Sequence, residues 1–150
     1  MILELLWRLR GLVVRPFHMG LIVVVGLVVE IGLRCSTVPR ISRRLGIRLD
    51  TSSNSAPSSG ISEVGQLPGW VLGRCAAVDM VFRRWPFDNT CLRRALVLGQ
   101  RLRRLDPVLV IGVRHDDAGR LAAHAWLTVR GVALDPLASQ FAALGSIAGR

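Results

Sequence analysis

The chain has 150 residues, 51% of them hydrophobic, and its mean hydropathy of +0.42 is high for a soluble protein. This length corresponds to about one domain, and it suffices to bury a core. All twenty basic residues are arginine and the net charge is +10, which favours a polyanion, an anionic membrane surface or an acidic peptide as partner. Three irregularly spaced cysteines without a CxxC pair argue against a disulfide scaffold and a structural zinc site, and favour a reducing cytosol.

The N-terminal third of the sequence is predicted to be helical, apolar and basic. Apolar positions recur with helical spacing over residues 1–15, and Pro16 is expected to interrupt that helix. Residues 19–33 are the most apolar stretch, but their uninterrupted part is eleven residues long and ends before Glu30. A membrane span needs roughly 20 residues. We therefore expect a buried or membrane-touching helix here, and neither a span nor a signal peptide.

A further short helix is expected to begin near residues 39–40, where Pro39 suits a helix start. The positive charge is densest in this part of the chain. Residues 1–48 carry eight arginines against two glutamates, a net charge of +6, whereas residues 49–150 have a net charge of +4. This distribution favours a membrane or a partner protein over nucleic acid.

Residues 50–62, DTSSNSAPSSGIS, contain six serines and are predicted to form a flexible linker, because they cannot bury enough apolar area to become ordered. The chain is therefore divided into a basic apolar helical segment (1–49), this linker (50–62) and a C-terminal domain (63–150).

The C-terminal domain begins with two predicted helices, which cover about residues 70–84 and 91–105 and are separated by Pro86. Cys75 lies on the apolar side of the first helix and is expected to be a core residue. Three strands follow, PVLVIGVR, LAAHAWLTV and VALD, and they predict an antiparallel meander with a tight turn at Arg130-Gly131. A short helix is expected around residues 137–144. This order predicts an α+β domain.

Cys91 is the candidate nucleophile. The residues before it, DNT, are all good N-caps, which puts Cys91 in the first turn of its helix. There the backbone N–H groups and the helix dipole favour a thiolate and can hold an oxyanion. Arg93 and Arg94 would favour the thiolate further. Trp85 and Asn89 are both open as a second oxyanion donor.

His124 is the candidate base and Asp135 the residue that orients it. Strand alternation places His124, Trp126 and Thr128 on one face, which is expected to pack on the helix that Cys91 begins. The Arg130-Gly131 turn would put Asp135 opposite Trp126 and diagonal to His124. An imidazole held by a carboxylate can take the thiol proton and return it to a leaving amine. His115 is expected to be a surface residue, and Trp126 either lines the site or fills the core.

At CLRRALVL, VLVIGVR, AHAWL and Asp135, over about residues 70–145, the sequence resembles the transglutaminase-like cysteine peptidases of lasso peptide biosynthesis. In that family the peptidase is the second half of the split B protein. The resemblance implies a transglutaminase/papain-like core with Cys91 as nucleophile, His124 as base and Asp135 as orienter, and no cofactor or metal. Ala95 is a departure, since a small hydroxyl residue is often expected there.

The resemblance also implies the partners and the compartment. They are a precursor peptide, a separate leader-recognition protein and a macrolactam cyclase, in the cytoplasm. The charge distribution and the apolar N-terminal segment predict no nucleic-acid partner, and they allow membrane contact through residues 1–49. Two other interpretations remain open: an acyltransferase or amidase that uses the same three residues, and a basic membrane-associated or nucleic-acid-binding adaptor without catalysis.

Overall fold

The computed structural model describes residues 2–50, 67–88, 90–115 and 119–144, with their side chains from His18 onward. Its helices are α1 (Ile2–Cys35), α2 (Val38–Arg44), α4 (Gly69–Phe82) and α5 (Cys91–Arg101), with the 3₁₀ helices η1 (Arg103–Leu105) and η2 (Pro136–Gln140). Its strands are β1 (Arg48–Leu49), β2 (Val108–His115), β3 (Leu121–Val129), β4 (Val132–Ala133) and β5 (Ala142–Ala143). Helices on a small mixed sheet confirm the predicted α+β class.

The sheet contains the predicted meander and two additional short strands. β2, β3 and β4 are neighbours and antiparallel, and Gly112 pairs with His124. The turn between β3 and β4 has positive φ at both central residues, 53° at Arg130 and 82° at Gly131, which matches the right-handed twist of a tight hairpin. β1 joins β2 in parallel and β5 joins it antiparallel, so the sheet is mixed.

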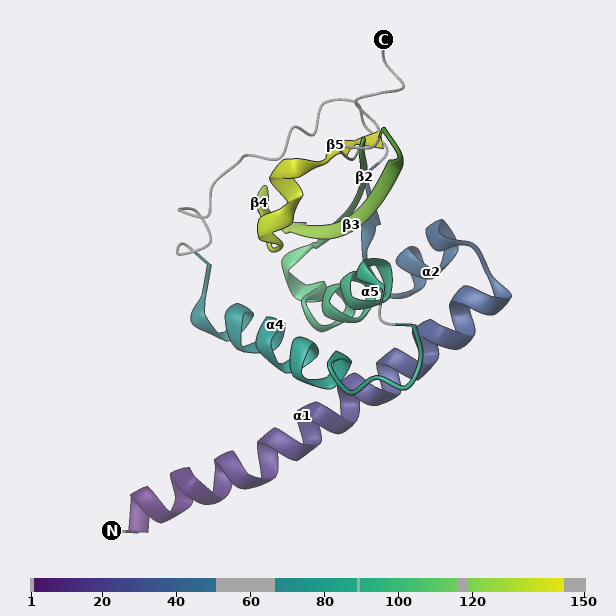
Figure 1. Cartoon of the computed structure of the whole chain (residues 1–150). Helices are drawn as coiled ribbons and strands as arrows, with labels where there is room; N and C mark the ends of the chain where they lie inside the picture. Colours follow the sequence, from purple (N-terminus) through teal and green to yellow (C-terminus); the bar gives the residue numbers. More distant parts are fainter. Residues whose placement is uncertain (1, 51–66, 89, 116–118, 145–150) are drawn as a thin grey trace.

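The helices are layered on one face of this sheet (Figure 1). α5 lies between the sheet and α1, and α4 runs beside α1 and α5. Leu96 and Val97 of α5 are fully buried against Leu109, Ala125 and Leu127 of the sheet. The alternate strand residues point to the opposite face, where they form a smaller cluster with η2 and β5. The buried members of this cluster are Val110, Trp126, Ala138 and Ala143.

α1 differs from the prediction, because it is one helix from Ile2 to Cys35 and Pro16 does not interrupt it. A proline inside a helix removes one backbone hydrogen bond and costs about 3 kcal/mol. The helical apolar spacing continues on both sides of Pro16, and a helix of this length evidently tolerates that single loss. α2 starts at Val38 after Thr37, close to where it was predicted.

The end of the chain also differs from the prediction. A helix was expected over residues 137–144, but the chain forms the short 3₁₀ helix η2 and then strand β5. Asp135 caps η2 and Pro136 begins it, while Ala142 and Ala143 hydrogen-bond to β2. The backbone N–H and C=O groups of Ala142 and Ala143 pair with the edge of β2, and they are therefore not available for the hydrogen bonds of a helix.

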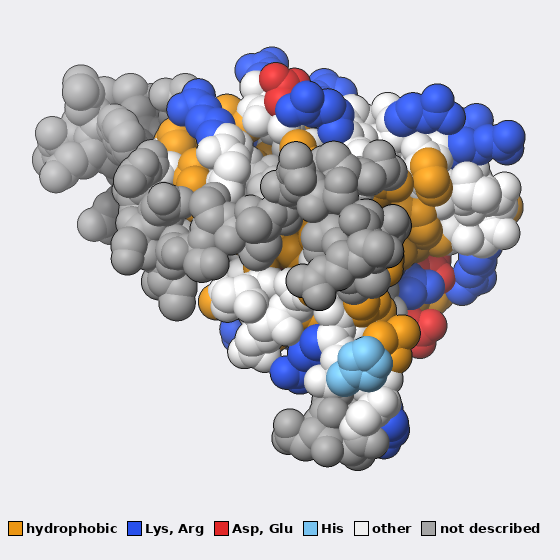
Figure 2. Space-filling view, turned by 90° about the horizontal axis from the view of Figure 1, so that it is seen from above, with side chains coloured by type: hydrophobic (Ala, Val, Ile, Leu, Met, Phe, Trp, Pro, Cys, Tyr) orange, Lys and Arg blue, Asp and Glu red, His pale blue; other side chains and the backbone are white. Residues whose placement is uncertain are grey.

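α1 is the candidate for membrane contact. Its window His18–Cys35 is long and apolar enough to cross a membrane, with a mean hydropathy of 1.9, by length and composition alone. The core helix of a soluble protein can pass the same test, and Ile22, Val25 and Val29 of α1 are indeed buried in the core. In Figure 2, many of the visible arginine side chains lie along the upper edge of the molecule, and others lie at its right and lower sides.

The main core draws on both sides of the serine-rich segment. Ile22, Val25 and Val29 of α1 belong to one cluster with Ile41, Ile47 and the buried side chains of α4, α5 and the sheet. The predicted linker, apart from Asp50, lies outside the described residues, and the division into 1–49, 50–62 and 63–150 stays a prediction.

Candidate active site

The first turn of α5 holds the candidate nucleophile. Thr90 is the N-cap, in an extended conformation, and its Oγ1 accepts a hydrogen bond from the backbone N–H of Arg93 at 3.4 Å. Cys91 is therefore the first residue of the helix, as predicted, and its side chain is half-buried. The unpaired N–H groups of a helix start and its dipole favour negative charge at this position.

His124 and Asp135 are held together on neighbouring parts of the sheet. The distance from His124 Nε2 to Asp135 Oδ2 is 2.9 Å, and the two side chains are 13% and 33% exposed. Continuing the β3–β4 register, in which Thr128 faces Ala133, places Asp135 opposite Trp126, where the sequence predicted it. A carboxylate that accepts this hydrogen bond favours the tautomer with the proton on Nε2, which leaves Nδ1 as the acceptor.

One cavity of about 330 Å³ brings these groups together. Cys91 of α5, His124 of β3 and Asp135 after β4 all line it. The expectation that the His124 face packs on α5 is wrong, because α5 packs on the alternate residues Ala125 and Leu127. β4 pairs with β3 only at Thr128 and Val129, so β4 does not cover the edge of β3 beside His124. The cavity therefore lies where the first part of α5 meets this edge of the sheet.

Two aromatic side chains pack against the imidazole ring of His124. Trp126 lies with its ring centroid 6.0 Å from that of His124 and nearly parallel to it, and Phe141 lies at 4.9 Å. Trp126 is almost fully buried and also lines the cavity, so it has both roles that the sequence left open. Phe141 was not identified from the sequence, because it follows η2 and its position depends on how η2 folds back.

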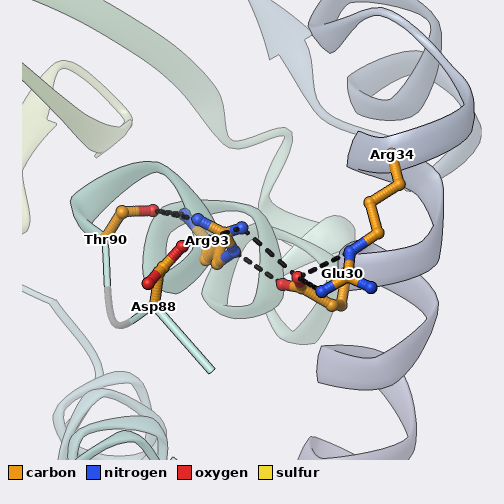
Figure 3. A network of polar contacts seen from close by, with 5 residues as sticks. All are labelled: Glu30, Arg34, Asp88, Thr90 and Arg93. Carbon is orange, nitrogen blue, oxygen red and sulfur yellow. Dashed lines mark hydrogen bonds and ion pairs between the residues drawn. The ribbon is translucent and has the colours of Figure 1, made fainter. Parts of the chain in front are cut away.

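A buried carboxylate ties α1 to α5, the helix that Cys91 begins (Figure 3). Arg93 Nε donates to Glu30 Oε2 at 2.6 Å, Arg93 Nη1 donates to Thr90 Oγ1 at 3.2 Å, and Arg34 Nη2 donates to Glu30 Oε1 at 2.9 Å. Glu30 is only 5% exposed. The hydrogen bond from Arg93 holds the pKa of Glu30 below its ordinary value, although burial acts in the opposite direction.

This contact changes the role expected of Arg93. Its guanidinium is directed to Glu30 on α1, and the pairing raises the pKa of Arg93. Arg94, in contrast, lines the cavity and forms an ion pair with Asp79 of α4. In the sequence, Glu30 was identified only as the end of an apolar run. Its contact with Arg93 could not be predicted, because the two residues are 63 positions apart.

Cys75 lines the same cavity but has a different environment from Cys91. It packs against the cluster of Val71 and Leu102, in keeping with a core residue, and burial followed by the charge of Asp79 raises its pKa to about 11. Its thiol is therefore protonated at neutral pH, and this makes it a poor nucleophile.

The remaining predicted positions are placed as follows. His115 is exposed at the end of β2, as expected. Trp85 stacks on Phe82 in the helical layer and is not among the described residues that line the cavity. Asn89, the other candidate oxyanion donor, lies outside the described residues.

The fold and the cavity together define a class of protein. An α+β domain with a cysteine at a helix start and a histidine–aspartate pair on the adjoining sheet is the architecture of transglutaminase-type thiol enzymes. The transglutaminase-like superfamily matches residues 27–146, and the chain therefore belongs to that family. Its members are typically cysteine peptidases or acyltransferases. Comparisons with curated proteins and with solved structures gave no match.

Proposed function

We propose that the chain is a cysteine peptidase that removes the leader from a ribosomally made lasso peptide precursor. The observation that carries the enzymatic part is the hydrogen-bonded His124–Asp135 pair, which lines one cavity with Cys91. The choice of substrate is supported by the resemblance of CLRRALVL, VLVIGVR and AHAWL to the leader peptidases of that pathway.

In the proposed mechanism His124 Nδ1 takes the proton of the Cys91 thiol as sulfur attacks the carbonyl carbon of the scissile amide. The N–H groups at the start of α5 stabilise the oxyanion of the tetrahedral intermediate. When the C–N bond breaks, the imidazolium gives its proton to the leaving amine, and a thioester remains on Cys91. His124 then deprotonates a water, which hydrolyses the thioester and regenerates the thiol. Asp135 keeps Nε2 protonated and stabilises the imidazolium in both steps.

The proposed partners are the leader region of the precursor, a separate leader-recognition protein and a macrolactam cyclase that acts on the new amino terminus. The chemistry requires no cofactor or metal. The proposed compartment is the cytoplasm, with α1 available for contact with a membrane surface.

The test is incubation of the chain with the co-encoded precursor and leader-recognition protein, followed by mass spectrometry of the products. Hydrolysis at one bond gives a free leader carboxylate and a core peptide with a free amino terminus. If the acyl group is instead transferred to an added amine and no free acid forms, the acyltransferase alternative replaces the peptidase.

A further inference from the structure

A second and larger pocket, about 750 Å³, lies between α1 and α4. The two helices approach closely near the end of α4 and diverge toward its start (Figure 1). The lining includes His18 of α1, Trp70, Gly73 and Arg74 of α4, and Arg101 at the end of α5. Cys91 and Arg101 are at opposite ends of α5, about 15 Å apart at the helical rise, so this pocket is remote from the cysteine.

Two half-buried arginines give this apolar pocket a positive end. Arg101 Nη2 donates to His18 Nδ1 at 2.9 Å, and Arg74 donates to the Arg101 carbonyl oxygen. Within the described part of the chain, Arg101 Nε is buried and has no hydrogen-bond partner. Burial, and then the charge of Arg74, lower the pKa of Arg101. A polar N–H that is buried without a partner is unfavourable, and a carboxylate could accept a hydrogen bond from it.

The rim of the pocket has the composition of a protein interface. Trp70 and Met80 are 47% and 52% exposed, and the guanidinium of Arg74 lies 4.6 Å from the Trp70 ring centroid. Tryptophan, methionine and arginine are enriched at protein–protein interfaces. The volume of the pocket is also within the range of ligand-binding cavities.

We infer that this pocket docks a peptide segment that carries a carboxylate beside large apolar side chains. The carboxylate pairs with Arg101 and Arg74, and the apolar side chains fill the space between α1 and α4. This segment belongs to the complex of leader and leader-recognition protein, an assignment that rests on the proposed function. The pocket is then an exosite that holds the substrate complex while the remote cysteine cleaves it.

A blocking substitution tests this without removing any contact. An added Cβ at Gly73 meets no atom within 4 Å, and the same is true of Gly20, which is exposed on α1 and outside the lining. Leucine also favours helix over glycine at both positions. Gly73→Leu therefore fills the pocket in a folded protein, and Gly20→Leu is its matched control.

The measurement is the affinity of a fluorescent leader peptide, bound to its recognition protein, for each variant in a Cys91→Ala background. KM and kcat are measured in the Cys91 form. We expect Gly73→Leu to weaken binding and raise KM by about tenfold or more with kcat at saturation unchanged, while Gly20→Leu leaves both unchanged. Arg101→Gln should weaken binding similarly, unlike Arg44→Gln, which removes an exposed charge on α2.

Equal binding by Gly73→Leu and Gly20→Leu would overturn the docking site, even if the wild type cleaves the precursor. Failure of the wild type to cleave would instead contradict the proposed function. Dodecanoate, an apolar carboxylate without a peptide backbone, is titrated in parallel. If it binds in a Gly73-dependent manner and the peptide complex does not, the occupant is a lipid and the inference is wrong.

Discussion

Asp135 accepts two hydrogen bonds with its two carboxylate oxygens. Oδ2 accepts from His124 Nε2 at 2.9 Å, and Oδ1 accepts from the backbone N–H of Leu137 at 2.8 Å, where it caps η2. The second bond keeps the carboxylate facing the ring, because it fixes the side chain to the backbone of the next element. The same residue thus orients the imidazole and starts the segment that brings Phe141 against it.

Substituting asparagine for Asp135 removes the negative charge but keeps an oxygen that can cap η2. Asp135→Asn retains an oxygen for the Leu137 N–H, but it loses the negative charge that stabilises imidazolium. We expect kcat to fall on the order of 10²–10⁴-fold, the usual contribution of acid–base catalysis, with the Tm little changed. Asp106→Asn is the control, since Asp106 is exposed in a left-handed conformation that asparagine tolerates. Equal rates in the two variants would show that Asp135 has no part in the reaction.

The positions of Cys91, His124 and Asp135 were predictable because each depends on local rules. A run of N-cap residues sets the helix start, and a tight turn sets the strand register. The role of Glu30 was not predictable, because its partner Arg93 lies 63 positions further along the chain. The contact of Phe141 with His124 was not predictable either, because Phe141 follows the irregular segment η2. The position of the cavity at the edge of the sheet was not predictable either, because it depends on β4 being only two residues long.

At the scale of elements, the contact of Glu30 with Arg93 joins α1 to the start of α5. Because the folded-state pKa of Glu30 lies below its ordinary value of 4.5, this contact stabilises the fold above about that pH. The stabilisation is lost as the pH falls through the lowered pKa. Glu30→Gln should therefore lower the Tm near neutral pH.

The difference in Tm between wild type and Glu30→Gln should shrink as the pH falls through the lowered pKa of Glu30, because the wild-type carboxylate then becomes protonated as well. Thermal unfolding monitored by circular dichroism at several pH values measures it. Asp88→Asn is the control within the same network, because Asp88 is 86% exposed and 4.0 Å from Arg93. A difference that is constant with pH would contradict a contribution from the ionised Glu30.

The packing of α1 on the segment after α4 is tight at Gly26. A Cβ added there would lie 2.5 Å from Cη2 of Trp85, whose ring is itself stacked on Phe82. Gly26→Ala should therefore destabilise the fold by about 1–3 kcal/mol through overpacking, less the gain in helix propensity. Gly20→Ala, where an added Cβ meets nothing within 4 Å, should stabilise it. Denaturant unfolding gives both values, and a stabilising Gly26→Ala would contradict this packing.

The regular elements were predictable from apolar periodicity, and α4, α5, β2 and β3 agree closely with their predicted ranges. The two-residue strands β1 and β5 were not, because they have no pattern of their own and exist only through pairing with β2. Their formation depends on tertiary contacts, as does the continuation of α1 through Pro16.

At the scale of the whole molecule, α1 contributes to the core that supports the active-site helix. Ile22, Val25 and Val29 are buried there, and each such side chain is worth about 1.5–3 kcal/mol. Their sum approaches the whole stability of a typical domain, which is about 5–15 kcal/mol. The family match also begins at residue 27, within α1.

A fragment consisting of residues 63–150 should therefore lack cooperative thermal unfolding, which circular dichroism measures. Adding residues 1–49 as a separate chain should restore helical signal and a cooperative transition. If the fragment alone unfolds with the Tm of the full chain, then residues 63–150 are an independent domain, as the division at the linker predicts.

The central claim is that Cys91 cleaves a leader peptide with His124 as its base. The most direct measurement is mass spectrometry of the co-encoded precursor after incubation with the leader-recognition protein and either wild type, Cys91→Ala, His124→Ala or Cys75→Ala. We expect the wild type and Cys75→Ala to release the leader, and Cys91→Ala and His124→Ala to leave the precursor intact while keeping the wild-type circular dichroism spectrum. Leader release by the folded Cys91→Ala and His124→Ala variants would contradict the account.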